Sequence, residues 1–222
     1  MVYPAAHAAP FRPSSLMAST LLRVIVASAV AVGTALAPSA LPAQTLAGDM
    51  TVDNSFTAYL STSVGAQGSQ IASGTNWTQT YSFSGVALTP GQTYYLQVRG
   101  VDVGVISAFI GDFTLTGDFA FANGSQFLTT NIDHWFGSAT GFGVSPVALR
   151  NQGANGVGPW GTRPNIDAGA DFIWSQDNCI NCTRYFWTTI TPTAQIPEPA
   201  SLALIGAGAL GLLGVAARRR RA

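Results

Sequence analysis

The stretch Thr93-Tyr-Tyr-Leu-Gln-Val-Arg99 carries the strongest strand signal in the chain, and it follows the dipeptide Pro90-Gly91. Aromatic and β-branched residues dominate the stretch, and such residues fit the pleated, half-buried backbone of a β-sheet. Proline presets the backbone of a tight turn, and glycine supplies the left-handed position that many turns require. The stretch therefore predicts a tight turn followed by a strand.

Strand-like segments continue on both sides of this stretch. Residues 56–61 alternate, with Phe56, Ala58 and Leu60 on one face, and the residues from Trp77 to Phe83 also share a face at period two. Further segments follow at residues 106–110, 112–116, 119–121, 172–174 and 185–190, with an Asn123-Gly124 turn signal among them. Because no ten-residue segment here has a helical period, we predict an all-β fold, a two-sheet antiparallel β-sandwich or jelly roll.

The beginning of the chain has the layout of a secretory signal peptide. Arg23 precedes a short apolar run over residues 24–37, and Pro38-Ser-Ala-Leu-Pro-Ala-Gln44 supplies a breaker and small residues. We predict a cleavable signal peptide over residues 1–43, cut after Ala43, with Ala40 as the next choice. Met17 begins a more ordinary charged region than Met1 and is an alternative translation start. A two-span membrane protein is the alternative to cleavage.

The end of the chain has three parts in a fixed order. Pro197, Glu198 and Pro199 form a stiff, extended motif that cannot start a helix. An uncharged apolar run over residues 202–217 follows, and as a helix it spans about 24 Å, slightly less than a bilayer core. Arginines are retained on the cytoplasmic side of a membrane, so this run predicts one short transmembrane helix with its end inside. The basic cluster that stops it comprises Arg218, Arg219, Arg220 and Arg221.

This tail, residues 196–222, closely resembles the PEP-CTERM sorting signal of Gram-negative bacteria that make exopolysaccharide. The resemblance implies export through the Sec translocon, transient anchoring in the inner membrane, and recognition of the Pro197–Pro199 motif by an exosortase-type enzyme. It also implies delivery to the cell surface or extracellular matrix, near polysaccharide or biofilm. An ordinary tail anchor is the alternative.

The part between the two ends, residues 44–195, is long enough for one β-sandwich domain with a real core. It contains four arginines, nine aspartates and no lysine, a net charge near −5. Such a surface repels phosphate backbones, so we do not expect nucleic acid as a partner. Its two cysteines, Cys179 and Cys182, are the only ones in the chain, and outside the inner membrane we expect them to form a disulfide.

The middle of the chain also resembles a galactose-binding-like jelly-roll module. The first half of the resemblance rests on residues 53–60, Gly74-Thr-Asn-Trp77, and Leu88-Thr-Pro-Gly91 before residues 94–98. The second half rests on residues 130–135, Gly158-Pro-Trp-Gly161, residues 170–174 and Tyr185-Phe. Such modules often carry Asn-Gly after the first strand, whereas this chain has Ser61-Thr-Ser-Val-Gly65. These are core and turn residues, so the resemblance implies a fold and not an activity.

We found no catalytic constellation and expect a protein that is not an enzyme. Glutamate is absent before Glu198, so a glycosidase would need two aspartates. Asp133 and His134 form the only acid–imidazole pair, but adjacent strand residues point to opposite faces. The nucleophile elbow Gly-x-Ser-x-Gly is absent. An aspartate-dependent hydrolase is therefore the most distant of the alternatives.

A carbohydrate-binding, lectin-like module is the nearer alternative to a structural matrix protein. Four of the five tryptophans lie in strand-like patterns and are expected in the core, whereas Trp160 lies in a loop with no period. If a carbohydrate is bound, Trp160, Arg163 and Asp167 are the predicted contacts. The favoured alternative is that Trp160 plugs one end of the sandwich. We expect no cofactor or metal. A structural calcium ion at Asp53, or at Asp112 with Asp118, is an alternative that no ligand spacing supports.

Overall fold

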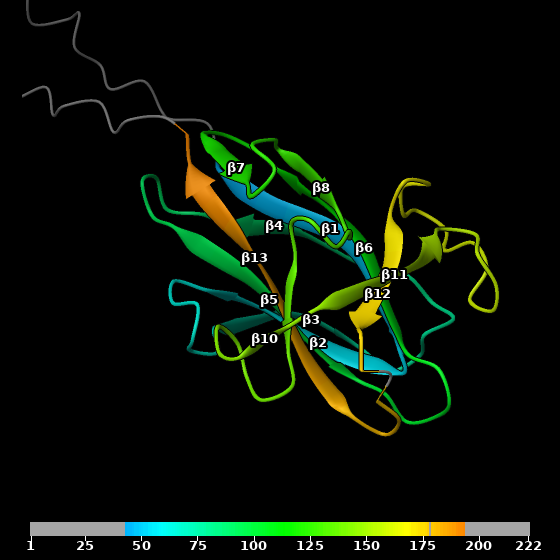
Figure 1. The fold of residues 1–222 in the computed structure, drawn as a ribbon. Coiled ribbons are helices and arrows are strands. Elements are labelled where there is room, and N and C mark those ends of the chain that lie inside the picture. Colours follow the sequence, from blue (N-terminus) through cyan, green and yellow to red (C-terminus); the bar gives the residue numbers. More distant parts are fainter. Residues whose placement is uncertain (1–42, 178, 194–222) are drawn as a thin grey trace, which may run out of the picture. The chain divides into compact units, whose positions relative to one another are not determined.

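The computed structural model describes residues 43–177 and 179–193, which form a sandwich of two antiparallel sheets (Figure 1). The strands of the first sheet, sheet A, lie in the order β11 (Leu149–Ala154), β12 (Asp171–Ser175), β6 (Ala108–Leu115), β1 (Thr45–Asp53), β4 (Tyr81–Ala87), with β8 (Phe127–Thr129) also on β6. The strands of sheet B lie in the order β10 (Pro146–Val147), β9 (Phe136–Ser138), β13 (Thr183–Pro192), β5 (Tyr94–Val101), β2 (Ser55–Ser61), β3 (Ser69–Gly74), with β7 (Phe119–Phe121) also on β13. The predicted all-β, two-sheet fold is confirmed.

The chain passes repeatedly from one sheet to the other. It leaves sheet A after β1, returns at β4, and crosses again between β4 and β5 and between β5 and β6. This winding is consistent with a jelly roll. The stretch that begins at Thr93 becomes β5, which lies between β13 and β2 in sheet B. The Pro90-Gly91 turn before it is also confirmed, since Gly91 has a φ of 76° and the amide of Gln92 donates to the carbonyl of Thr89.

The main core lies between the sheets and is rich in aromatic rings. Phe109 of β6 packs edge-on against Trp135 and at a tilt against Phe186 of β13, with ring centroids 5.1 and 5.3 Å apart. Trp174 of β12 is fully buried against Phe186. Trp135 belongs to this core although it lies in the loop before β9 and not in a strand.

Each sheet also buries residues on its outer face. Because strand side chains alternate, Ala108 and Ile110 of β6 point away from the main core, and the loop of residues 155–170 covers them. On sheet B, Trp187 and Tyr59 point outward, and Phe142 packs over them. Two loops therefore extend the buried volume beyond the two-layer core.

The predicted strand from Trp77 to Phe83 is wrong in its first half. The strand β4 begins at Tyr81, and Trp77 lies in a turn. The side chain of Asn76 accepts hydrogen bonds from the amide and the hydroxyl of Thr78, 3.0 and 2.7 Å away. Such an Asx turn competes with strand pairing, which explains why the period-two pattern fails here.

The first and last strands begin and end at the same end of the sandwich, next to residues 116–118. The amide of Thr116 donates to the carbonyl of Thr45, and the amide of Thr193 donates to the carbonyl of Asp118, both at 2.9 Å. Pro192 also pairs with Phe119 of β7, beside the head of the orange arrow in Figure 1. Residues 43 and 193, the first and last that the structure describes, therefore lie at this end of the domain.

Candidate functional site

Trp160 is buried and is part of the cover over the outer face of sheet A. Its side chain is only 5% exposed, and its ring stacks on Phe172 of β12 with centroids 5.0 Å apart and planes 22° apart. The indole N–H donates to Oδ2 of Asp53, 3.1 Å away. A sugar ring needs an exposed aromatic face, so the contact predicted for Trp160 is not accessible in this structure.

The other two predicted sugar contacts lie in the same loop, residues 155–170, and they hold it together. The guanidinium of Arg163 lies 5.5 Å from the ring centroid of Trp77, donates to the carbonyl of Trp77 at 3.2 Å, and also donates to the carbonyl of Trp160. Asp167 is exposed, and its Oδ1 accepts from the amide of Gly169 at 2.7 Å. The structure brings the three predicted residues together as a loop scaffold.

Two buried carboxylates lie behind this loop, at the end of the sandwich opposite the chain ends. Asp53 and Asp102 are 5% and 1% exposed. Burial raises the pKa of the Asp53 carboxyl; the hydrogen bond from Trp160 opposes the rise, and the charge of Asp102 adds to it. Burial also raises the pKa of Asp102, whose Oδ2 accepts from the amide of Asn181 while Oδ1 is buried without a partner among the described residues.

The described residues contain no group of three His, Cys, Asp or Glu side chains placed to hold a metal ion. Of the residues considered for calcium, Asp53 binds Trp160 as above, and Asp112 accepts from the amide of Asp167 at 2.7 Å. Burial raises the pKa of the Asp112 carboxyl as well. Asp118 is exposed in the turn that receives the end of β13.

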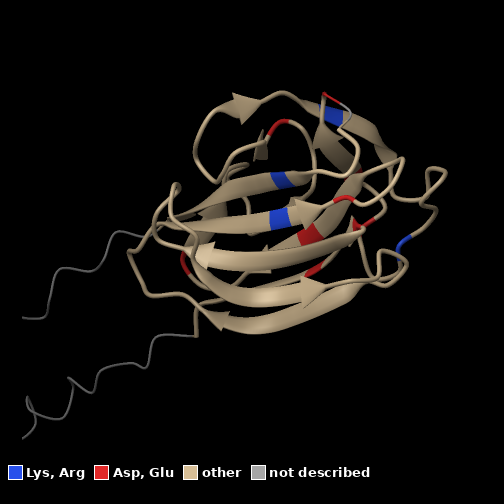
Figure 2. Ribbon diagram, turned by 90° about the horizontal axis from the view of Figure 1, so that it is seen from below, with Lys and Arg blue, Asp and Glu red and all other residues tan. Residues whose placement is uncertain are grey.

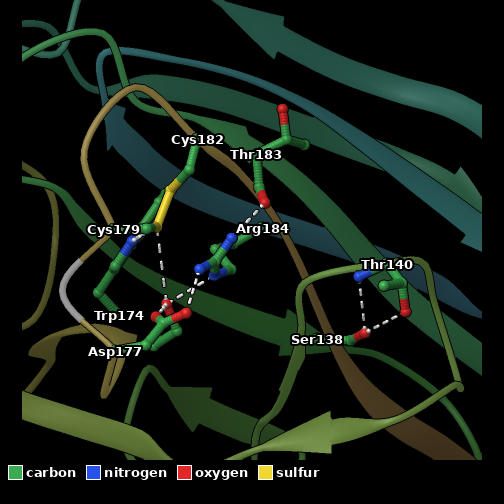
Figure 3. A network of polar contacts seen from close by, with 9 residues as sticks. Ser138, Thr140, Trp174, Asp177, Cys179, Cys182, Thr183 and Arg184 are labelled. Atoms are coloured by element: carbon green, nitrogen blue, oxygen red, sulfur yellow. Dashed lines mark hydrogen bonds and ion pairs between the residues drawn. A yellow bond between two sulfur atoms is a disulfide. The ribbon is translucent and has the colours of Figure 1, made fainter.

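The disulfide Cys179–Cys182 is confirmed and closes a turn beside β13 (Figure 3). Beneath it, the buried Arg184 donates from Nε to the hydroxyl of Ser175 at 2.7 Å and forms an ion pair with Asp177. The Ser175 hydroxyl bonds Asp177 at 2.6 Å and, together with Arg184, holds the pKa of that carboxyl below its usual value. The polar side chains of Ser175, Asp177 and Arg184 all bond to one another, as expected of a cluster with a structural role.

Asp133 and His134 were predicted on a strand, and this prediction is wrong, because residues 132–134 form a bend before β9. The backbone amides of both residues donate to Oδ1 of Asn131, at 3.0 and 2.8 Å. His134 is half-buried, as predicted, and Asp133 is exposed. The two residues are thus placed as members of one Asx-type turn.

A hollow lies at the lateral edge of the sandwich where β3 and β4 face each other. This β3–β4 groove has a volume of about 660 Å³ and is lined by residues 60–63 and 66–69 together with Ile71, Val86, Ala87 and Tyr94. None of these residues is charged, and Figure 2 shows how sparse charged residues are over the whole ribbon. Sequence reasoning missed the groove. Its lining includes Ser61, Thr62 and Ser63, in the segment where the chain departs from the galactose-binding-like pattern, and that departure had argued against a ligand role for the loop.

None of the described residues forms a helix long and apolar enough to cross a membrane. The predicted signal peptide, the sorting residues Pro197, Glu198 and Pro199, the helix at residues 202–217 and the arginine cluster lie outside the described residues. Neither a curated protein nor a solved structure matches the chain. Residues 195–221 match the family model of the PEP-CTERM protein-sorting motif. The chain thus carries a PEP-CTERM protein-sorting motif at the end of an all-β sandwich, which implies an exported protein that an exosortase sorts at the membrane.

Proposed function

We propose that this protein is a non-catalytic component of the cell surface or extracellular matrix, associated with exopolysaccharide or biofilm. The match at residues 195–221 carries the proposal, because it gives the chain a route out of the cell and a tail of the kind that an exosortase recognises. The body that this route delivers is a disulfide-bonded sandwich with no lysine and few charges, a composition suited to a location outside the cytoplasm.

The non-catalytic part of the proposal is supported by the positions of the acidic and basic side chains. Asp133 and His134 lie in one bend, where their backbone amides donate to Oδ1 of Asn131, and Asp177 is held by Ser175 and Arg184. Asp53 and Asp102 are buried and therefore screened from a large substrate. A matrix protein needs a stable, exposed framework and no acid–base pair, and these contacts supply the framework.

Sorting is tested by fractionating cells that express the chain with Glu198→Gln. This change keeps the shape of the side chain and removes the carboxylate between the two prolines. We expect the full-length precursor to accumulate in the inner membrane, while the unaltered chain is shortened and recovered at the cell surface or in the matrix. Thr193→Ser, a conservative change at an exposed residue outside the matched residues 195–221, is the matched control and should be sorted normally.

The same fractions test the proposed location. The shortened protein should co-sediment with extracellular polysaccharide and be freed when that polysaccharide is degraded enzymatically. Normal release of the Glu198→Gln chain would contradict the sorting role. Recovery of the full-length chain from the cytosol with both cysteines reduced would contradict export altogether.

A further inference from the structure

The wall of the β3–β4 groove is held in place by a buried residue that is not itself in the groove. Gln97 of β5 is 0% exposed. Its amide nitrogen lies within hydrogen-bonding distance of the carbonyls of Ser63, Val64 and Ala66, at 3.3, 3.2 and 3.0 Å. Its amide oxygen accepts from the N–H of Gly68 at 3.2 Å. One side chain thus fixes most of the loop of residues 62–68.

Two further contacts keep this loop rigid. The hydroxyl of Ser61 lies 2.8 Å from the carbonyls of both Ser63 and Ala66, and it also accepts from the amide of Ser63. Val64 packs into the cluster of Tyr59, Phe142 and Trp187 on the outer face of sheet B. A binding site formed before its ligand arrives loses little conformational entropy on binding, so this wall is preorganised.

The lining of the groove combines an aliphatic floor with a neutral polar rim. Leu60, Ile71 and Val86 supply apolar surface between the two sheets. On the rim, Thr62, Ser63, Gln67 and Ser69 are exposed, and their side chains form no hydrogen bond to another described residue. These hydroxyl and amide groups can both donate and accept, which is what the hydroxyl groups of a sugar require.

We propose that the β3–β4 groove binds an uncharged oligosaccharide segment. This inference deepens the proposed association with extracellular polysaccharide and rests on it for the source of the ligand. The volume of about 660 Å³ lies within the range of small-ligand sites. The carboxylate of a uronic acid would find no positively charged side chain in the lining of the groove. Neutral sugars are therefore favoured over uronic acids.

A peptide strand is the competing occupant, because β3 and β4 are the outer strands of their sheets. Both strands are irregular, however. The pairing of β2 with β3 shifts register between Ala58 and Tyr59, and β4 contains Gly85 at a φ of 69° beside a shift in its pairing with β1. An added strand needs a regular ladder of free backbone groups, and bulges interrupt that ladder. The observations therefore favour a sugar over a strand.

The test is calorimetric titration of the full chain in the detergent lauryldimethylamine oxide, which carries no sugar. The probes are maltohexaose, cellohexaose, mannohexaose and β-1,4-galactohexaose, with hexagalacturonate as the charged comparison. We expect saturable binding of at least one neutral hexasaccharide and weaker or no binding of hexagalacturonate. Ser69→Arg should weaken that binding by about tenfold or more, because it places a bulky charge in a neutral groove.

Ser73→Arg is the matched control, since Ser73 is an exposed serine on the same strand that does not line the groove. Circular dichroism should show that both variants fold. The proposal is overturned if no neutral probe binds, if Ser69→Arg binds as well as the Ser73→Arg control, or if hexagalacturonate binds best. None of these results would affect the Glu198→Gln experiment, so failure of the groove and failure of the sorting role are separable.

Discussion

At the scale of the residue, Trp160 is buried against the body of the domain, which agrees with the alternative to sugar contact and not with the contact itself. It was singled out because it lies in a loop with no hydrophobic period, and such residues are often exposed. The structure buries it by folding the loop onto the outer face of sheet A, against Phe172. Periodicity describes which face of a strand is buried, and it carries no information about a loop that packs on a sheet.

The hydrogen bond from Trp160 to Asp53 should be measurable in the free energy of unfolding. Trp160→Phe keeps most of the apolar contact and removes the only side-chain donor that the structure gives to the Asp53 carboxylate. We expect a loss of about 1–3 kcal/mol, the cost of leaving a buried acceptor unpaired. Urea denaturation measures it, and the double variant with Asp53→Asn should lose less than the sum of the single changes.

The buried carboxylates Asp53 and Asp102 predict that the stability of the folded protein depends on pH in an unusual way. The pKa of Asp53 is raised in the folded protein, so folding favours its protonated form. Its contribution to stability is therefore most favourable below its unfolded pKa of 3.8 and is lost as the pH rises through the raised value. The pKa of Asp177 is lowered, so its contribution has the opposite sign and is lost as the pH falls.

Asp53→Asn separates these two effects. We expect the variant to gain melting temperature relative to the unaltered chain at pH 7 and to lose that advantage as the pH approaches 4. Ser73→Thr, a change between two uncharged side chains at an exposed position, is the control and should shift the melting temperature equally at both pH values. An Asp53→Asn chain that is less stable than the parent at pH 7 would mean that the charge is compensated in the folded protein.

At the scale of the element, turns and strands were predicted correctly where the backbone preferences of neighbouring residues determine the local structure. The Pro90-Gly91 turn, the strand that follows it and the Asn123-Gly124 turn all appear, and Gly124 has the positive φ that the turn requires. Prediction failed where a side chain captures the backbone. Asn76 turns the chain at Trp77, and Gln97 holds a loop more than 25 residues away in sequence. Neither of these side-chain hydrogen bonds produces a periodic pattern of apolar residues in the sequence.

The turn closed by Cys179–Cys182 is an element that can be tested alone. Replacing both cysteines by serine should cost at most about 2 kcal/mol, because a loop this short restricts few unfolded conformations. The amide of Asn181, which donates to Asp102, should become less protected against hydrogen exchange, while the amides of β5 stay protected. Loss of protection across the whole domain would show that the disulfide supports the fold and not merely the turn.

At the scale of the whole molecule, the sequence predicted the fold class and the sorting motif, and it did not predict the β3–β4 groove. The motif is local in sequence and was readable from three ordered segments, which the match at residues 195–221 bears out. The β3–β4 groove is formed by four segments that only the topology brings together. Because the uncharged residues that line the groove are scattered along the sequence, their common neutrality became apparent only in the structure.

The shared position of the first and last strands has a practical consequence for a protein that is expected to be trimmed twice. Thr45 and Thr193, near the two ends of the described part of the chain, are fastened to residues 116 and 118, and no strand of that part extends past them. Proteolysis at the predicted site after Ala43, and anywhere after Thr193, would therefore leave every strand pairing of both sheets intact. The proposed removal of residues 1–43 and of the C-terminal tail would therefore require no refolding of the sandwich that remains.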